Sequence, residues 1–414
     1  MTLNIEAIRS KFPSLSQTVN GEPIIYLDNP AGTQVPKQVM DAVVNYYTTM
    51  NANQGGFFPT SIATDNLVHE AREIVADMLC APNADEIVFG PNMTSLNFAF
   101  TRALANTLPD DSEIIVSRMD HDANVSPWLA IARDRNFTVK WIDFDPEAGT
   151  LDLSTLEAAL SEKTQVVAAV HASNALGTIN PVEQIAEMAH SVNALYVMDA
   201  VQSAPHVPID VTKIGCDVML CSAYKFFGPH IGVMWGRYDL LEKLPAYKVR
   251  PAKDKTPYRW ETGTPSFETI AATAEAVRYL ESLAGDEISI TGYEGRRARI
   301  KQAFANMQVY ERQLAEKMLK GLQDIPGITI AGITDMDKLE QRVATVIFVK
   351  DGHSADEMAQ HLSKHNIFAW SGDYYAVEVM KRLGREDTGM VRVGAVHYNT
   401  LDEIDKLLNV VEML

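Results

Sequence analysis

Two charged side chains stand at the ends of apolar stretches, where they could act on a ligand. Lys225 follows the stretch Asp217–Ser222 and precedes a Gly-Pro pair, and Asp199 ends the stretch Leu195–Asp199. The two residues are 225 − 199 = 26 positions apart, which leaves room for one crossover connection between neighbouring parallel strands. Open α/β sheets bind ligands at the carboxyl ends of their strands, so we expect Lys225 and Asp199 to face one crevice.

A lysine and a carboxylate in one crevice meet the needs of pyridoxal phosphate. Burial lowers the pKa of a lysine, and its neutral amine then attacks aldehydes. A carboxylate beside the pyridine nitrogen of the cofactor keeps that nitrogen protonated. Each residue taken singly also has a plain structural explanation, Lys225 as a surface lysine in a loop and Asp199 as a helix N-cap.

A phosphate group needs backbone N–H donors, and the segment Phe89–Ser95 offers them. It joins an apolar stretch to a helix expected from about Thr94, and the free N–H groups at a helix start favour phosphate. The simpler alternative is that Asn92 or Thr94 is a plain helix cap. His121 follows the stretch Glu113–Ser117, where its ring could stack on a cofactor or have a structural role only.

The elements that must position these residues alternate between apolar stretches and helical ones. This alternation predicts an α/β fold with a mostly parallel sheet, covered by helices on both faces. The expected strands are 86–89, 113–117, 138–142, 165–171, 195–199, 217–222 and 232–236. From Arg296 a long amphipathic helix is expected to run to Leu322, and a smaller α+β pattern follows it.

We therefore predict three parts of the chain. Residues 1–20 form an N-terminal segment that packs on the small domain, and residues 21–295 form the large, cofactor-binding domain. Residues 296–414 form the bridging helix and a small C-terminal domain, of ordinary size for a domain.

Composition narrows the classes of partner. The chain of 414 residues has 54 acidic and 36 basic side chains, a net charge of −18, which argues against nucleic acid or an anionic membrane as the main partner. Its three cysteines, Cys80, Cys216 and Cys221, are too few and too scattered for a disulfide framework or a metal site. The first residues lack the pattern of a signal peptide, and no apolar run approaches membrane-spanning length. We expect a cytoplasmic protein that acts on a small molecule and holds no metal.

Seven segments match the motifs of one family in residue type, order and spacing. They are Val170–Pro181, Met198–Gln202 and Ser222–Lys225, with support from Tyr26–Gly32, Asp120–Asn124, Glu261–Pro265 and Arg392–Thr400. In these segments the chain resembles the class V aminotransferase family, and within it most closely the cysteine desulfurase branch. The resemblance covers nearly the whole chain. It implies fold type I of the pyridoxal-phosphate enzymes, pyridoxal 5'-phosphate as cofactor, and a homodimer with shared active sites.

The resemblance also implies roles around the ring of the cofactor. Lys225 would hold the cofactor as a Schiff base and later move protons as general acid and base. His121 would stack on the ring face and take part in proton transfer. Asp199 would pair with the pyridine nitrogen, and Gln202 would bond the ring oxygen.

Further matches concern the phosphate and the substrate. The residues expected to hold the phosphate are Met93, Thr94, Ser222 and Tyr224, together with Thr264 reaching over from the neighbouring subunit. Asn174 would lie beside the substrate. Arg392 would bind the α-carboxylate of the substrate with its planar guanidinium, and a surface salt bridge is the weaker alternative for it.

The chain departs from the cysteine desulfurase branch at three places. That branch carries a cysteine on a mobile loop just ahead of the arginine segment, whereas Phe368–Ala376 has no cysteine and has Tyr374 and Tyr375 instead. Tyr224 stands where the branch usually has histidine. The segment Asn51–Gly56 is neutral where the branch commonly has a histidine and an arginine.

The function expected from these observations is that of a cysteine desulfurase-like enzyme acting on an amino acid through a quinonoid carbanion. Carbon–sulfur cleavage by β-elimination would need no enzyme thiol, and transamination or, with less support, epimerisation are the alternatives. A non-catalytic protein would be expected to have lost one of the matching site residues. A nicotinamide-dependent dehydrogenase is excluded because no Gly-x-Gly-x-x-Gly motif follows an early strand.

Overall fold

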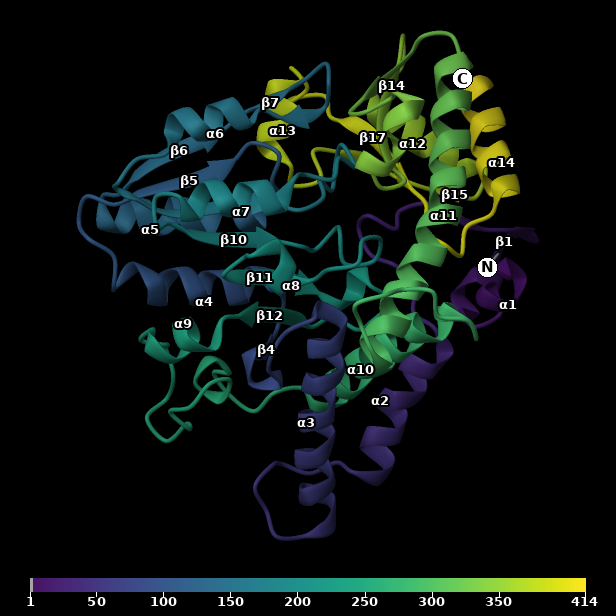
Figure 1. The fold of residues 1–414 in the computed structure, drawn as a ribbon. Coiled ribbons are helices and arrows are strands. Elements are labelled where there is room, and N and C mark those ends of the chain that lie inside the picture. The colour runs from purple at the N-terminus through teal and green to yellow at the C-terminus, as the bar shows by residue number, and fades with distance from the viewer. Residues whose placement is uncertain (1–2) are drawn as a thin grey trace.

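The computed structural model describes residues 3–414, and its centre is a seven-stranded sheet (Figure 1). From one edge to the other, the strands are β4 (Ile87–Gly90), β12 (Gly232–Gly236), β11 (Val218–Ser222), β10 (Leu195–Asp199), β9 (Thr164–Val170), β5 (Glu113–Ser117) and β6 (Thr138–Ile142). Neighbouring strands are parallel except at β12, which is antiparallel to both β4 and β11. The mostly parallel sheet and the seven strands predicted for it are confirmed, with ends that differ by one residue at most.

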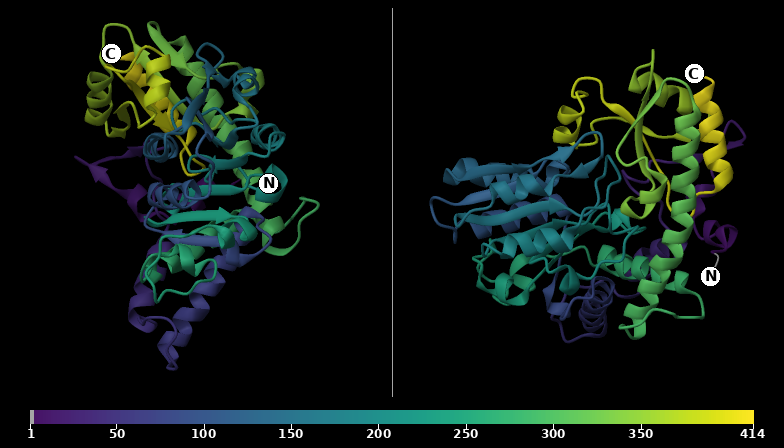
Figure 2. Two further views of the ribbon diagram at one scale, coloured as in Figure 1. Left: turned by 90° about the vertical axis from the view of Figure 1, so that its left-hand side faces the viewer. Right: turned by 45° about the horizontal axis from the view of Figure 1, so that its top comes forward.

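Helices cover both faces of the sheet (Figure 2). Alternate residues of the strands enter two separate cores, one on each face. On β10, Tyr196 and Met198 pack in the core that contains α3 (Pro59–Leu79), α7 (Val182–His190) and α10 (Phe267–Glu281). Val197, between them, packs in the core that contains α4 (Met93–Ala105) and α5 (Ser126–Arg135). Because side chains alternate along a strand, burial of both faces makes these strands continuously apolar.

A second, four-stranded sheet is antiparallel throughout and has its own core. Its strands are, in order, β13 (Ile328–Ala331), β14 (Thr345–Lys350), β17 (Met390–Gly394) and β16 (Trp370–Gly372). The helices α12 (Ala355–Lys364) and α14 (Leu401–Glu412) contribute Met358, Leu362 and Leu407 to this core. The smaller α+β pattern expected after residue 322 is thus present.

One long helix, α11 (Gly295–Asp324), joins the two parts and runs alongside both of them in Figure 1. Ile300 and Phe304, in its first half, pack in a core of the large sheet, whereas Leu314 and Leu322 pack in the core of the small sheet. The predicted bridging helix is therefore confirmed, although it begins one residue earlier and ends two residues later than expected. The division of the chain at residues 21 and 296 stays a prediction.

The N-terminal segment contacts both parts of the molecule. Phe12 lies against the rings of Tyr279 and Tyr398, at centroid distances of 5.3 Å and 4.8 Å. Arg9 donates to the carbonyl of Tyr398 over 2.7 Å and pairs with Glu403 of α14. These contacts hold residues 9–12 beside the segment 395–400, which leads from β17 to α14.

A short strand that follows the N-terminal segment connects the start of the chain to its C-terminal part. β3 (Ile25–Tyr26) pairs in parallel with β15 (Ile367–Phe368), and Asp28 forms a bridge with Gly394 at the end of β17. The remaining elements are α1 (Ile5–Arg9), β1 (Thr18–Val19), β2 (Glu22–Pro23), α2 (Lys37–Thr49), β7 (Phe144–Asp145), β8 (Thr150–Leu151), α6 (Leu153–Ala159), α8 (Val211–Ile214), α9 (Tyr238–Lys243) and α13 (Val377–Arg382). Among the helices of residues 3–414, none is long and apolar enough to cross a membrane.

Candidate active site

The carboxyl ends of β10 and β11 open into one cavity of about 60 Å³, because the two strands are parallel neighbours. It is lined by Asn92, Met93, Thr94, His121, Ala123, Val170, Ala172, Asn174, Asp199, Val201, Gln202, Ser222, Tyr224 and Lys225. A larger chamber of about 520 Å³ adjoins it, shares Lys225 and His121 with it, and also contains Arg392. Nine of the eleven predicted site residues thus line the inner cavity, and Arg392 lines the chamber.

Lys225 is buried, with 7 % of its surface exposed, in the short helical turn that follows β11. Its Nζ donates a hydrogen bond to the carbonyl oxygen of Pro30. Burial, and secondly the positive charge of Arg392, lower the pKa of Lys225 to about 7, while Asp28 and Asp199 oppose this effect. A substantial fraction of Lys225 is therefore a neutral amine near pH 7, the form that reacts with an aldehyde. The alternative of a surface lysine is wrong.

Asp199 ends β10 with a carboxylate that is 1 % exposed. Its Oδ1 accepts a hydrogen bond from the backbone N–H of Val201 at 2.8 Å, and Asp199 caps no helix. Burial raises its pKa to about 6, although Val201 and Lys225 act in the opposite direction. A buried carboxylate with one backbone donor favours a cationic partner, and a protonated pyridine nitrogen is such a partner.

His121 presents a neutral ring to the cavity. Burial lowers its pKa to about 4, with Lys225 and Arg392 as further causes. Its Nδ1 accepts a hydrogen bond from the backbone N–H of Ala123 at 3.0 Å, so the proton of the ring is on Nε2. One face of the ring stacks on Tyr375, with centroids 5.4 Å apart and an angle of 22° between the planes.

The N-cap and first turn of α4 contribute Asn92, Met93 and Thr94 to the wall of the cavity. Asn92 is its N-cap and accepts from the backbone N–H of Ser95 at 2.8 Å, as the simpler alternative for this residue expected. The Ser222 hydroxyl accepts from the backbone N–H of Met93 at 3.0 Å. A Cβ at Gly232 would lie 2.4 Å from the carbonyl carbon of Asn92, so only glycine lets β12 approach the start of this helix.

Tyr224 stands at the wall between this turn and the chamber. Its ring stacks on His230 with centroids 5.0 Å apart, and Lys225 Nζ lies 5.3 Å from the ring centre. Burial raises the pKa of Tyr224, so its hydroxyl stays protonated and can donate a hydrogen bond.

Arg392 contacts a backbone carbonyl, a carboxylate and an aromatic ring. It is 4 % exposed, donates to the carbonyl of Asn174 at 3.1 Å, and lies 3.5 Å from a carboxylate oxygen of Asp28. Its guanidinium carbon lies 4.4 Å from the centre of the Tyr374 ring. Within residues 3–414 its Nε has no hydrogen-bond partner, which leaves a buried donor for a ligand.

The loop that carries the two tyrosines is tied to the site on both sides. Asn174 Nδ2 donates to the carbonyl of Tyr374 at 2.9 Å, and the backbone N–H of Asp122 donates to the carbonyl of Tyr375 at 2.7 Å. Tyr374 and Tyr375 both have positive φ angles, of 55° and 58°. Positive φ costs free energy for residues with a side chain, so these contacts must hold the turn in place.

The cysteines lie elsewhere. All three are free and buried, and burial raises the pKa of each thiol. None of them lines the cavity or the chamber. All three therefore have the burial of small apolar side chains.

Two predicted features lie outside the cavity. Thr264 is exposed and lines neither the cavity nor the chamber, and the neutral segment Asn51–Gly56 also lies apart from both. Sequence reasoning missed Asp28 as the partner of Arg392 and the Pro30 carbonyl as the partner of Lys225. Both belong to the quoted segment Tyr26–Gly32, but nothing in the sequence pairs that segment with residues 200 to 360 positions away.

Comparison of the chain with known proteins identifies its family. The family model described as Aminotransferase class-V matches residues 25–407. The chain belongs to the class V aminotransferase family. Over 434 residues it is 34% identical to a probable cysteine desulfurase of Streptomyces coelicolor, which covers 99% of this chain and 97% of that relative. Over 426 residues it is 33% identical to a probable cysteine desulfurase of Mycolicibacterium paratuberculosis, and spans 99% of this chain but 58% of that relative's length.

A solved structure extends the comparison to the fold. The apo cysteine desulfurase from Thermococcus onnurineus NA1 superimposes with a TM-score of 0.87, at 28% identity, over 100% of this chain and 98% of the other. The resemblance to class V aminotransferases and the expected fold type I are confirmed, and the predicted enzyme class is confirmed at the level of this family.

Proposed function

We propose that the chain is a pyridoxal-phosphate enzyme of the cysteine desulfurase-like type, acting on a small amino acid. The observation that carries this proposal is the pair of Lys225, a buried amine with a pKa of about 7, and Asp199, a buried carboxylate in the same cavity. The buried Oε1 of Gln202 and the buried Oδ1 of Asn174 also have no partner within residues 3–414. A polar aromatic ligand between these groups would meet their unsatisfied hydrogen-bonding capacity.

In this proposal each residue of the cavity binds a different group of the cofactor. Lys225 would bind its aldehyde carbon, Asp199 its ring nitrogen and Gln202 its ring oxygen, and His121 would cover its free face. Met93, Thr94, Ser222 and Tyr224 would bind its phosphate at the start of α4. When bound, pyridoxal phosphate supplies an aldehyde that links to an amine and a ring that takes up electron density.

The chain's own groups then act on the substrate. Arg392 would bind the α-carboxylate in the chamber, exchanging its contact with Asp28 for a substrate oxygen. This fixes the bond from the α-carbon to hydrogen beside Lys225, whose neutral amine removes the proton. Neutral His121 excludes water from the ring face and has its Nε2–H available as a donor. Asn174 links the loop to the site through the Tyr374 carbonyl and keeps Arg392 in place through its own carbonyl.

We favour carbon–sulfur cleavage by β-elimination among the possible reactions. The relatives are named cysteine desulfurases, yet no thiol lies in the loop 368–376 or on the cavity wall. Sulfur would leave as hydrogen sulfide without visiting an enzyme cysteine. From L-cysteine and one water, the products are hydrogen sulfide, pyruvate and ammonia, which balances all atoms. Transamination is the second candidate, because it too requires Lys225 and no thiol.

We also propose a homodimer with shared active sites. Large apolar side chains are exposed on α2, in the two residues before α3 and in the first turn of α3, namely Val44, Tyr47, Phe57, Phe58 and Ile62. These two helices project from the molecule in Figure 1. A surface of this kind favours burial against a second copy, and Thr264 would then reach the phosphate of the partner's cavity. A location in the cytoplasm stays a prediction.

Absorbance spectroscopy with product analysis tests the proposed function. Protein purified with pyridoxal phosphate should show a visible band that changes with L-cysteine, accompanied by sulfide and pyruvate in equal amounts. Loss of the band with L-alanine or L-glutamate, without sulfide, would make the chain an aminotransferase, and a D-amino acid product would make it an epimerase. Absence of any visible band would refute the proposal. Analytical ultracentrifugation of the same sample tests the dimer.

A further inference from the structure

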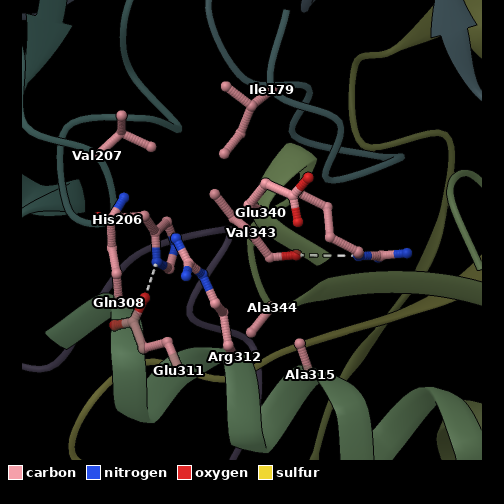
Figure 3. Close-up of a pocket in the computed structure, with 11 residues that line it drawn as sticks. Ile179, His206, Val207, Gln308, Glu311, Arg312, Ala315, Glu340, Val343 and Ala344 are labelled. Atoms are coloured by element: carbon pink, nitrogen blue, oxygen red, sulfur yellow. Dashed lines mark hydrogen bonds and ion pairs between the residues drawn. The ribbon is translucent and has the colours of Figure 1, made fainter. Parts of the chain in front are cut away.

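The chamber next to the cofactor cavity has more room than L-cysteine needs. Its volume is about 520 Å³, and sites of roughly 300 to 1,000 Å³ hold ligands of drug size. The small cavity beside the hydrogen-bonded pair His206 and Glu311 (Figure 3) has a volume of about 20 Å³, which is room for about one water. Beyond its α-carbon, L-cysteine has only a CH₂ group and a thiol. The chamber therefore fits a substrate whose sulfur carries a further group.

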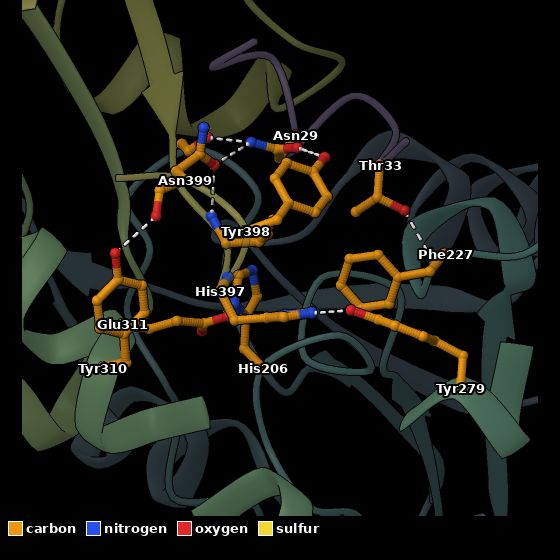
Figure 4. A network of polar contacts seen from close by, with 12 residues as sticks. Asn29, Thr33, His206, Phe227, Tyr279, Tyr310, Glu311, His397, Tyr398 and Asn399 are labelled. Carbon is orange, nitrogen blue, oxygen red and sulfur yellow. Dashed lines mark hydrogen bonds and ion pairs between the residues drawn. The ribbon is translucent and has the colours of Figure 1, made fainter. Parts of the chain in front are cut away.

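One wall of the chamber, which contains Pro30 and Ala31, is fixed from behind. The neighbouring Asn29 donates through Nδ2 to the carbonyl of Gly394, at the end of β17, over 2.7 Å. The same Nδ2 donates to Oδ1 of Asn399 over 3.1 Å, as Figure 4 shows. Both bonds are buried, so the place of this wall relative to β17 is defined before a ligand binds.

Another wall of the chamber contains aromatic side chains of the segment Trp370–Tyr375. Trp370 lies directly opposite Arg392 in the antiparallel pair of β16 and β17. Such a pair shares one face of a sheet, with Cβ atoms roughly 4.5 to 5.5 Å apart. The ring centre of Tyr374 lies 4.4 Å from the guanidinium carbon of Arg392. Two aromatic side chains thus adjoin the arginine that is expected to bind the α-carboxylate.

Tyr375 extends this wall towards the cofactor cavity. One face of its ring stacks on His121, with centroids 5.4 Å apart, yet Tyr375 is 68 % exposed and Trp370 is 55 % exposed. Both residues line the chamber, so their exposed surfaces are open to a ligand there. Aromatic rings bind other aromatic rings in stacked or edge-to-face arrangements. This wall therefore favours an aromatic group.

The charges beside this wall disfavour an anionic group. Asp373 is the one charged residue among positions 370–375, and its exposed carboxylate accepts from the backbone N–H of Tyr375 at 2.9 Å. Arg392 is engaged by the α-carboxylate, and Asp28 beside it is a second acidic group. Like charges in one site repel, so the group on sulfur is expected to be uncharged.

We propose that the preferred substrates are S-substituted L-cysteines with an uncharged aromatic group on sulfur, and that Trp370 and Tyr375 bind this group. The inference rests on the proposed function for cleavage of the carbon–sulfur bond, and adds to it the nature of the group on sulfur. The carboxylate on Arg392 and the α-carbon beside Lys225 fix where the side chain begins. L-cysteine then remains a substrate, but a slower one, because it leaves most of the chamber unfilled.

Cleavage of such a thioether balances without an enzyme thiol. Lys225 removes the proton of the α-carbon, and the electron pair left behind forms a double bond to the β-carbon. The bond from the β-carbon to sulfur breaks with its electron pair on sulfur, which takes up a proton and leaves as a thiol. The remaining 2-aminoacrylate reacts with one water to give pyruvate and ammonia. No oxidant or reductant is needed.

Binding of the aromatic group is measured first, by isothermal titration calorimetry of protein without cofactor. The two probes lack the amino group: 3-(benzylthio)propanoate corresponds to S-benzyl-L-cysteine, and 3-mercaptopropanoate corresponds to L-cysteine. We expect the benzyl compound to bind at least about ten times more tightly, because its ring adds apolar and aromatic contact. Trp370→Leu and Tyr375→Leu should each reduce this preference about 2- to 10-fold, and Tyr375→Phe should retain it. Equal affinity of the two probes overturns the inference whether or not the cofactor binds.

Trp141→Leu is the matched control for Trp370→Leu. Trp141 is a partly exposed residue of β6, packs on Arg118 with 4.8 Å from the guanidinium carbon to the ring centre, and lines neither the cavity nor the chamber. Its replacement should leave the preference for the benzyl compound unchanged. An equal loss of preference in Trp141→Leu and Trp370→Leu would overturn the role of Trp370.

Turnover is measured next, in protein loaded with pyridoxal phosphate. S-benzyl-L-cysteine should give pyruvate and phenylmethanethiol in equal amounts, with kcat/KM at least about ten times that of L-cysteine. S-carboxymethyl-L-cysteine, whose substituent is anionic, should be cleaved more slowly than the benzyl compound. A higher kcat/KM for L-cysteine, or for the carboxymethyl compound, overturns this inference and leaves the proposed function in place. Absence of a visible band refutes the proposed function, and the calorimetry still decides whether the chamber binds the aromatic group.

Discussion

Replacing Lys225 by methionine should stabilise the cofactor-free protein at neutral and acidic pH. The native pKa of Lys225 is about 7, against an ordinary value of 10.5. At roughly 1.4 kcal/mol per pH unit, the difference of about 3.5 units corresponds to at most about 5 kcal/mol. The unaltered protein bears this destabilisation in full below pH 7, because the charged amine must remain buried.

The sign of the pH dependence follows from proton counting. Between pH 7 and pH 10.5 the unfolded chain holds a proton on Lys225 that the folded chain does not, so the free energy of unfolding rises with pH. Methionine has no such proton. The variant also lacks the hydrogen bond from Lys225 to the Pro30 carbonyl, which lowers its free energy of unfolding by about 1 kcal/mol at every pH. We therefore expect Lys225→Met to be more stable than the unaltered protein at pH 6 and slightly less stable at pH 10.5.

Urea unfolding of both proteins at pH 6, 8 and 10.5 measures this difference. Lys320→Met on α11 is the control, because Lys320 is half-exposed and pairs with Glu316 on the surface. That change should have a small and nearly constant effect. Parallel stability curves for Lys225→Met and the unaltered protein would refute the argument that burial makes Lys225 a neutral amine.

Three further predictions concern the substrate, the cofactor and the thiols. Arg392→Leu should raise KM about 10- to 100-fold with a smaller effect on kcat, since the charged pair forms before the reaction, and steady-state kinetics would contradict this by a fall in kcat alone. Asp199→Asn should weaken binding of pyridoxal phosphate at least about 100-fold by absorbance titration, because the cationic ring nitrogen loses its buried partner, and equal affinity would exclude that pairing. Cys80, Cys216 and Cys221 should resist a thiol reagent in the folded protein and react in denaturant, and a fast-reacting thiol in the folded state would contradict their burial.

Strand and helix positions in the large domain follow from local pattern, which is why the sequence predicts them well. Buried strands such as β10 and β11 are continuous apolar runs, and their order along the chain places Asp199 and Lys225 at one sheet edge. Periodicity and topology therefore predict that Asp199 and Lys225 share a cavity, whereas most of the other site residues follow from the resemblance to the class V aminotransferase family.

The contacts that complete the site could not be predicted in the same way. β3 pairs with β15, and Asp28, two residues after β3, then forms a bridge with Gly394. This brings Asp28 to Arg392, which is more than 360 positions away in the sequence. The pairing of Glu311 with His206 depends on where the long helix crosses the loop after β10, which no local pattern specifies. Thr264 is exposed in a single chain, so its expected contribution depends on a partner subunit.

Chemical trapping of the cofactor on the protein tests the central claim most directly. Borohydride reduction of protein loaded with pyridoxal phosphate fixes a carbon–nitrogen double bond as a stable amine, and peptide mass spectrometry locates it. The account predicts one modified residue, Lys225, and no modification in Lys225→Ala. An unmodified Lys225, with the label absent or on another lysine, would contradict the account.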